Sequence, residues 1–389
     1  MKTGSDSSAK DPVRLFELAL IFLKLGTIAF GGPAAHIAMM EDEFVRKRHL
    51  ITEEDFLDRV AAASLIPGPS STEVGIFIGR SLRGTVGLVV AGGCFIIPAA
   101  VLVTVIAAAY VRFGSLPRVE GILQAIKPAV IAIILQAVWK LGRTAAKTSA
   151  LVAIGIASIL LNLWGASPLL VLAFAGAGSG SVYLWGSRRS ATVLCNFGVT
   201  TIFPVSLIAL ATVAEVPVRL GRLFLSFLKI GAVVFGSGYV LLAFLRSEFV
   251  THLNWLSEKQ LIDAVAVGQF TPGPVFTTAT FIGYLVAGVP GAAVATLGIF
   301  LPGFLFVALS GPLLPKIRRS AAAGAVLDGV VVGSLALMAV VAWELGRASV
   351  TDWLTVSILL VSTIVVFRFK INSAWLILGA GLVGWVARG

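Results

Sequence analysis

Apolar runs of about twenty residues, separated by short polar segments, recur along almost the whole chain. A helical run of that length crosses the hydrocarbon core of a bilayer, which is about 30 Å thick. The alternating ten-residue segments of a membrane β-barrel are absent. We therefore predict an all-α polytopic membrane protein with about thirteen transmembrane spans, near 15–40, 60–79, 84–111, 120–140, 149–164, 168–185, 192–214, 219–245, 261–285, 289–313, 322–344, 353–367 and 372–387.

The second half of the chain repeats the first at an offset of 205 residues. The segment 22–26 recurs at 227–231, Asp58 matches Asp263, and the later parts of the halves align after a slip of one residue. Internal repeats of this kind define the architecture of many transporters. We predict a disordered cytoplasmic tail without a signal peptide at 1–13, a first six-helix repeat at 14–190, one linker helix at 191–216 and a second repeat at 217–389.

The parity of the spans sets the orientation of the halves. Six crossings followed by one linker crossing turn the second half upside down, which predicts inverted repeats. If the spans that contain Pro-Gly-Pro re-enter instead of crossing, each half has odd parity and the halves become parallel. Segments on the side of the N-terminus hold 17 Lys and Arg, against 10 on the other side. This excess predicts a cytoplasmic N-terminus and a C-terminus outside. The charged stretch 41–59 is expected to lie along the membrane surface.

Composition narrows the classes of protein further. The chain is 58% hydrophobic and 13% charged, which excludes a soluble protein. The net charge is +11, and the Lys and Arg residues that cause it lie mostly between the apolar runs. This pattern is typical of membrane proteins, so the expected partner is the lipid bilayer and not nucleic acid. No Walker A motif, catalytic triad or HExxH motif is present, and Cys94 and Cys195 form no metal or redox motif. We therefore expect no enzyme, no cofactor and no metal.

Two copies of Pro-Gly-Pro interrupt apolar runs at equivalent places in the two halves. Proline lacks an N–H group and breaks a helix, and the hydroxyl residues that follow can start a new one. A helix N-terminus at membrane depth attracts anions, because free N–H groups and the positive end of the dipole point to the same place. The alternative is a kink that only shapes packing, but two matched copies favour a binding site. Its candidate residues are Pro67, Gly68, Pro69, Ser70, Ser71 and Thr72, with Pro272, Gly273, Pro274 and Thr277.

A second pair of breaks precedes the first. Adjacent small residues permit either close helix packing or unwound backbone that offers N–H groups to an anion. His36 follows one turn later and can donate to a substrate oxygen, although packing is the alternative. These candidates are Gly31, Gly32 and Pro33 in the first half, and Gly236, Ser237 and Gly238 in the second.

Three ionisable residues complete the candidate site. Lys24 and Lys229 occupy equivalent positions inside apolar spans, where a lysine costs about 2.5–3.5 kcal/mol on insertion scales. They are expected to supply counter-charge to an anion, and the alternative is snorkelling to the interface. Glu73 lies one turn after the first Pro-Gly-Pro, where the second half has Thr278. It is expected to couple or gate transport; a structural ion pair, for example with Lys24, is the alternative.

The motifs resemble those of the chromate ion transporter superfamily in its two-domain form. The resemblance rests on residues 30–43, on Pro67-Gly68-Pro69 with the following residues to Glu73, and on 269–280. It implies a protein of the bacterial inner membrane that exports chromate, confers chromate resistance and draws energy from the membrane potential or proton gradient. It also implies sulfate as a competitor. The motif positions of the family are carried here by Gly31, Gly32, Pro33, Pro67, Gly68, Pro69 and Glu73, whereas Gly238 stands where the first half has Pro33.

Other functions stay open at this point. A transporter or passive channel for sulfate or another oxyanion shares every feature above, because sulfate and chromate have nearly the same shape and charge. A membrane chromate reductase is a more distant alternative, since no flavin or haem motif is visible. A homodimer is also left open.

Overall fold

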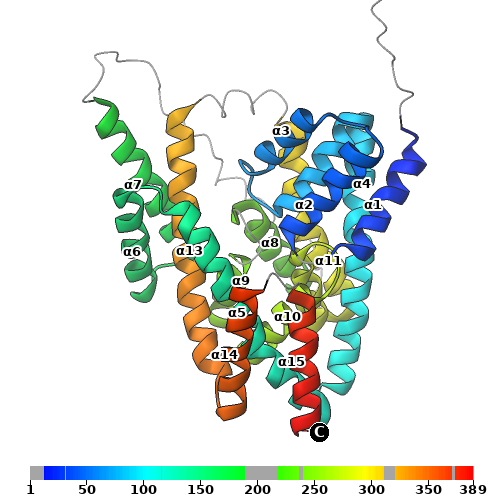
Figure 1. Cartoon of the computed structure of the whole chain (residues 1–389), viewed down its shortest axis with the longest axis vertical. Helices are drawn as coiled ribbons and strands as arrows, with labels where there is room; N and C mark the ends of the chain where they lie inside the picture. Colours follow the sequence, from blue (N-terminus) through cyan, green and yellow to red (C-terminus); the bar gives the residue numbers. More distant parts are fainter. Residues whose placement is uncertain are drawn as a thin grey trace, which may run out of the picture.

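The computed structural model describes residues 13–30, 32–114, 116–188, 218–235, 240–310, 320–369 and 373–388, and in these every regular element is a helix (Figure 1). The predicted linker at 191–216 lies outside the described residues, as does nearly all of the predicted tail. The first half contains α1 (Leu15–Ile28), α2 (Pro33–Glu41), η1 (Asp42–Lys47), α3 (Glu53–Ala63), α4 (Ser70–Phe113), α5 (Pro117–Ala145), α6 (Ser149–Leu163) and α7 (Pro168–Arg188). The second half contains α8 (Val218–Val233), α9 (Leu241–Leu245), η3 (Arg246–His252), α10 (Glu258–Phe270), η4 (Val275–Thr277), α11 (Thr278–Leu309), α13 (Ala321–Ser349), α14 (Trp353–Arg368) and α15 (Ser373–Arg388).

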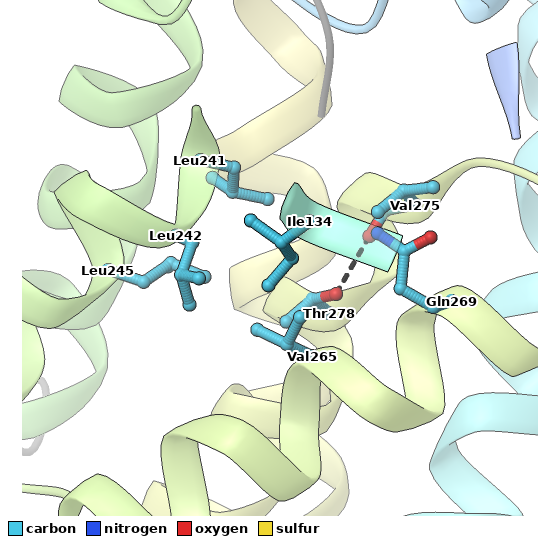
Figure 2. A pocket seen from close by; sticks show the side chains of 8 residues that line it. All are labelled: Ile134, Leu241, Leu242, Leu245, Val265, Gln269, Val275 and Thr278. Atoms are coloured by element: carbon cyan, nitrogen blue, oxygen red, sulfur yellow. Dashed lines mark hydrogen bonds between the residues drawn. The ribbon is translucent and has the colours of Figure 1, made fainter. Parts of the chain in front are cut away.

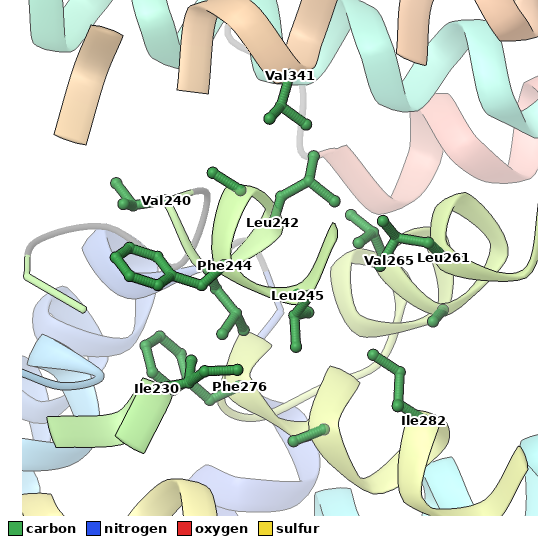
Figure 3. Close-up of a cluster of buried hydrophobic side chains, with 14 of the residues drawn as sticks. Ile230, Val240, Leu242, Phe244, Leu245, Leu261, Val265, Phe276, Ile282 and Val341 are labelled. Atoms are coloured by element: carbon green, nitrogen blue, oxygen red, sulfur yellow. The ribbon is translucent and has the colours of Figure 1, made fainter. Parts of the chain in front are cut away.

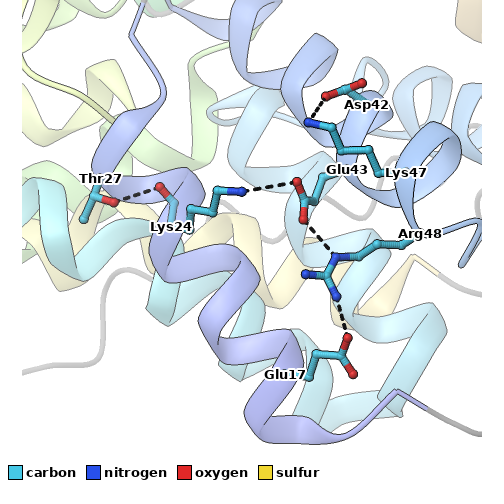
Figure 4. A network of polar contacts seen from close by, with 7 residues as sticks. All are labelled: Glu17, Lys24, Thr27, Asp42, Glu43, Lys47 and Arg48. Atoms are coloured by element: carbon cyan, nitrogen blue, oxygen red, sulfur yellow. Dashed lines mark hydrogen bonds and ion pairs between the residues drawn. The ribbon is translucent and has the colours of Figure 1, made fainter.

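The predicted span at 15–40 is a hairpin of two shorter helices. Helix α1 has 14 residues, about 21 Å at 1.5 Å per residue, and is too short to cross about 30 Å of hydrocarbon. The chain then reverses, and α2 with η1 returns alongside α1. Ion pairs join the arms: Lys24 Nζ lies 3.6 Å from Glu43, and Arg48 lies 2.5 Å from Glu17 (Figure 4). Gly32, at φ 78°, precedes Pro33 at the start of α2, so the predicted break is where the chain turns.

The predicted span at 60–79 is a second hairpin. Its arms are α3 and the first part of α4, residues 70–82, and Pro67-Gly68-Pro69 lies in the turn between them. Non-helical backbone at Arg83 and at Gly84, where φ is 61°, then reverses the chain into the long part of α4, residues 85–113. Gly79 packs against the backbone of Gly87, so the arm and the long part lie in close antiparallel contact. The stretch 41–59, expected along the surface, is divided between η1 and α3.

The second half builds the same two hairpins from equivalent residues. Helix α8 pairs with α9 and η3, and Lys229 lies 3.4 Å from Glu248 between the arms. Helix α10 leads into Pro272-Gly273-Pro274, and η4 begins the return. Non-helical backbone at Ala287 and Gly288 then starts the long part of α11, and Gly283 packs on Gly291 as Gly79 does on Gly87. The repeat in the sequence therefore becomes a repeat of hairpins.

The two long helices run in opposite directions (Figure 1). The arm 70–82 lies beside the later part of α11: Glu73 faces Gly303, and the Arg80 guanidinium donates to the carbonyl of Val307. This arm therefore runs parallel to α11 and antiparallel to the long part of α4. Parity counting from the sequence missed the reversal after α1. Inversion of the halves in the membrane stays a prediction, because the linker lies outside the described residues.

The remaining helices pack beside the hairpins. Helix α5 packs against α13, α14 and α15, and α13 packs against α6 and α7. An apolar cluster that includes Leu245, Phe276 and Ile282 joins the second half to α4, α5 and α7 of the first half (Figure 3). Among the described residues, five helices are long and apolar enough to cross a membrane: Ser70–Phe113, Val119–Ala145, Pro168–Trp185, Val275–Leu309 and Ala321–Ser349. The all-helical prediction is confirmed for the described part of the chain, and the count of thirteen spans stays a prediction.

Candidate functional site

The turns of the hairpins from the two halves meet through two backbone hydrogen bonds. The N–H of Gly68 donates to the carbonyl of Val234 at 2.7 Å, and the N–H of Gly273 donates to the carbonyl of Ala29 at 2.9 Å. The two bonds are equivalent under the 205-residue offset, since Ala29 matches Val234 and Gly68 matches Gly273. Each Pro-Gly-Pro turn therefore docks on the first hairpin of the opposite half. The helix breaks that were predicted in two distant parts of the sequence therefore lie next to each other in the structure.

Both central glycines are required by this close approach. Gly68 has φ 137° and Gly273 has φ 86°, values that residues with a side chain rarely adopt. A Cβ atom at Gly68 would also collide with the carboxylate of Glu73, and one at Gly273 would lie 2.6 Å from Cβ of Ala99. The turns have no room for any side chain at these two positions.

Two helices of the first half start at this place. Helix α2 begins at Pro33 and α4 begins at Ser70, and neither start has a side-chain cap. The first N–H groups of a helix have no partner within the helix, so these two starts offer donors and the positive ends of their dipoles. Close by, the hydroxyl of Thr72 is buried and makes no hydrogen bond. Donors therefore converge where an anion was predicted to bind.

His36 joins the two hairpins of the first half. Its Nδ1 lies 3.2 Å from Oγ of Ser71, and its Nε2 lies 3.1 Å from the carbonyl oxygen of Ala29. The side chain is buried, with its ring edge-on to Phe95. Because both ring nitrogens are engaged, the structure favours the packing alternative for His36 over direct contact with a substrate.

Glu73 is the acidic residue of the site. It is fully buried, and neither carboxylate oxygen has a hydrogen-bond partner. The ion pair considered between Glu73 and Lys24 is not formed, because Lys24 pairs with Glu43 on the returning arm of the first hairpin (Figure 4). A buried charge without a partner is strongly disfavoured, so the site favours either a proton or a bound cationic group at Glu73.

Lys24 and Lys229 lie away from the turns. Their side chains are 57% and 43% exposed, and each pairs with an acidic residue of the returning arm of its own hairpin. The reversal of the chain places them part-way along an arm rather than at its tip. At the exposed end of the first hairpin, Lys47 lies 2.6 Å from Asp42, and this hydrogen bond holds the pKa of Asp42 below its usual value.

The second Pro-Gly-Pro turn is closed in this structure. The hydroxyl of Thr277 donates to the carbonyl of Pro274, and that of Thr278 donates to the carbonyl of Val275, both at 2.8 Å. Figure 2 shows the second of these two bonds. The cavity beside them, lined by Gln269 among others, measures about 10 Å³, close to the least space that one water needs. An oxyanion enters only if the hairpins move. Gly31, Gly236, Ser237 and Gly238 lie outside the described residues.

One buried charged group was missed by the sequence reasoning. Lys127 Nζ lies 3.5 Å from Asp263, and the hydroxyl of Tyr110 donates to the same carboxylate at 2.9 Å. The sequence showed Lys127 inside an apolar span and Asp263 as the repeat partner of Asp58. The two residues are 136 positions apart, and only their meeting in space reveals the pair.

Comparison with known proteins identifies the family and finds the same repeat in the sequence. The family model described as chromate transporter matches residues 16–180 and again residues 221–385, one match in each half. A chromate transport protein of Cupriavidus metallidurans is 34% identical over 379 residues, which cover 96% of this chain and 93% of that protein. A probable chromate transport protein of Synechococcus elongatus is 32% identical, over 90% of this chain and 89% of its own length.

A shorter relative supports the division into halves. An uncharacterized transporter of Bacillus subtilis is 25% identical over 173 residues, which are 97% of its own length but 43% of this chain. No solved structure matches the chain. With a family match in each half, and with long relatives aligned over nearly the whole sequence, the chain belongs to the chromate transporter family.

Proposed function

We propose that this protein exports chromate from the cytoplasm by secondary active transport, driven by the proton gradient or the membrane potential, and so confers chromate resistance. The observation that carries the proposal is the reciprocal docking of Gly68 on Val234 and of Gly273 on Ala29. It brings broken helices of both halves to one place, where inverted-repeat transporters bind their substrates. We take chromate as the substrate because the two long relatives are named as chromate transport proteins.

In the proposed arrangement the halves are inverted repeats in the inner membrane. The hairpins of the first half open toward the cytoplasm with the N-terminus, and those of the second half open toward the outside. The binding place then lies between two sets of hairpins that open to opposite sides. Small movements of either set give access from one side at a time, as alternating access requires.

The chemistry of the turns suits a tetrahedral dianion. Its four oxygens accept hydrogen bonds from the starts of α2 and α4 and from the hydroxyl of Thr72. Lys24 and Lys229, on the arms, raise the local concentration of anions without holding them at the turn.

Glu73 links the anion to a proton in this proposal. A dianion next to a negative carboxylate is repelled, so the anion binds best when Glu73 carries a proton. Conversely, a bound dianion favours the protonated form of Glu73. Proton and anion binding are therefore coupled at one residue, so a proton leaves together with the dianion. Net negative charge then moves outward, which the inside-negative membrane potential drives and the pH gradient opposes. Thr278, at the equivalent place of the second half, carries no such group.

A transporter of sulfate or of another oxyanion is the second candidate. The described residues at the turns do not distinguish two tetrahedral dianions of similar size, because backbone N–H groups and a hydroxyl bind the oxygens of both.

Uptake into everted membrane vesicles tests the proposal. Energised vesicles are expected to accumulate chromate with saturable kinetics, and sulfate is expected to compete. Nigericin, which collapses the pH gradient, and valinomycin with potassium, which collapses the potential, identify the driving force. Vesicles without the protein are the control. Uptake of sulfate but not chromate would transfer the function to that anion, and uptake that neither saturates nor responds to the gradients would indicate a channel.

A further inference from the structure

A buried charged group lies between the two halves of the chain, away from the Pro-Gly-Pro turns. It joins three helices through Tyr110 of α4, Lys127 of α5 and Asp263 of α10. The side chains of Lys127 and Asp263 are only 9% and 1% exposed. Ionisable groups inside membrane-spanning helices are costly, and they mark substrate or ion pathways more often than scaffolding. The proposed chemistry at the turns makes no use of this group.

Lys127 borders a polar cavity of about 350 Å³, which we call the chamber. At about 30 Å³ each, it has room for roughly ten water molecules, in contrast to the closed turn. The chamber is lined by residues at the start of α5 and α10 and at the junction of α13 and α14, among them Glu120, Glu258, Lys259 and Ser349. Ser349 is 5% exposed, and its hydroxyl has no hydrogen-bond partner. A buried donor is thus available to whatever occupies the chamber.

The ion pairs around the chamber differ in length. Glu120 is hydrogen-bonded to Lys259, and Glu258 lies 2.8 Å from Arg246. Lys127 has the longest of these ion pairs, 3.5 Å to Asp263 Oδ1, an oxygen that accepts no hydrogen bond. Asp263 also keeps the Tyr110 hydroxyl on its other oxygen. Lys127 is therefore the cation that can turn to another anion while Asp263 retains a partner.

The repeat-equivalent positions of Lys127 and Asp263 do not form a second charged pair. The equivalent of Asp263 is Asp58, which is exposed, and the equivalent of Lys127 is Val331. Glu54 stands where the second half has Lys259. The charged chamber therefore belongs to one end of the molecule alone, the end where α10 and α14 begin.

We propose that the chamber is a transit site for the transported oxyanion, on the side of the membrane opposite the N-terminus, with Lys127 as its cation and Ser349 as a donor. This inference rests on the proposed function. The arriving dianion takes Lys127 from Asp263 and accepts a hydrogen bond from Ser349. When the anion leaves, Asp263 recovers Lys127. Competition from this built-in carboxylate keeps the affinity low, as a site on a conduction path requires.

Substitutions at the ion pair test the proposal in the vesicle assay. Lys127→Gln is expected to lower the rate of oxyanion transport about tenfold or more, because a charged hydrogen bond to the anion is lost. Lys127→Arg keeps the charge and is expected to retain most of the activity. Asp263→Asn removes the competitor, so KM is expected to fall severalfold together with the maximal rate, since release becomes slow. Asp58→Asn, the repeat equivalent, is the matched control and is expected to change neither.

A labelling experiment gives a readout that does not depend on turnover. Ser349→Cys, with Cys94 and Cys195 changed to serine, is treated from outside intact cells with a membrane-impermeant thiol reagent. Sulfate, at the concentration that halves chromate uptake, is expected to slow the labelling severalfold, and Lys127→Gln is expected to abolish this protection. Unchanged labelling in sulfate, or a Lys127→Gln variant with wild-type KM and rate, would overturn the transit site. If the unsubstituted protein moves no oxyanion at all, it is the proposed function that fails.

Discussion

Helices α3 and α10 are equivalent in sequence but differ in their surroundings. Phe56 and its repeat partner Leu261 are both buried, so the face that packs on the hairpin is the same. The next position differs: Leu57 is 57% exposed, whereas Ile262 is 2% exposed. Helices α5 and α15 cover α10, while α3 packs mainly on α4.

This comparison shows which features are the same in both halves and which features differ between them. The turns and their reciprocal backbone bonds are kept in both halves, because one set cannot dock without the other. Charged chemistry is not kept: the repeat partner of Glu73 is Thr278, and the pair of Lys127 with Asp263 is replaced by Val331 and Asp58. We infer that the halves share one scaffold and divide the transport steps between them.

The largest expected effect follows from breaking the preserved part. Gly68→Ala places a side chain at φ 137° and against the Glu73 carboxylate, a strain of about 1–3 kcal/mol before any collision is counted. Transport is expected to fall below a tenth of normal in vesicles with matched protein content. Gly93→Ala, in the long part of α4 and with open space for its Cβ, is the control and should keep its activity. Normal transport by Gly68→Ala would show that the turn geometry is dispensable.

The next effect concerns the acid that only the first half carries. Initial uptake by the unsubstituted protein, measured without gradients from pH 6 to 8, is expected to rise as pH falls, because protonated Glu73 accepts the dianion more readily. Glu73→Gln mimics the protonated form and is expected to give a flat pH profile and to lose coupling to the pH gradient. A profile in Glu73→Gln that is as steep as before would place the titrating group elsewhere.

A smaller difference is expected between the ion pairs of the two first hairpins. Glu43 is held by both Lys24 and Arg48 and its side chain is 8% exposed, whereas Glu248 is 19% exposed. Glu43→Gln is therefore expected to destabilise the protein by about 1–3 kcal/mol, and Glu248→Gln by less. Thermal unfolding of the purified protein in detergent measures the difference. Equal midpoints for the two variants would contradict it.

The smallest effect is expected at the exposed lysines. Lys24→Ala and Lys229→Ala remove cations from the arms and not from the turn, so KM should rise about two- to threefold with the maximal rate unchanged. The rise should shrink at high ionic strength, where exposed charges are screened. Complete loss of transport in either variant would instead place that lysine at the anion in another state of the cycle.

The sequence was sufficient for the class of protein, the repeat and the position of the helix breaks. Apolar runs of membrane length, a constant offset and Pro-Gly-Pro inside an apolar run are local patterns that persist whatever the chain does elsewhere. The same patterns located Pro67–Pro69, Pro272–Pro274 and Glu73, which the structure places at or beside the turns.

Only the tertiary structure decided where the chain reverses and which charges meet. An apolar run reports burial in lipid or protein, and it does not say whether the helix after a break continues or turns back, as α2 does after α1. For the same reason Lys24 was expected at the anion and lies instead beside Glu43. The pairing of Lys127 with Asp263 depends on the packing of α5 on α10, and a contact between residues so far apart in the chain leaves no local pattern to recognise.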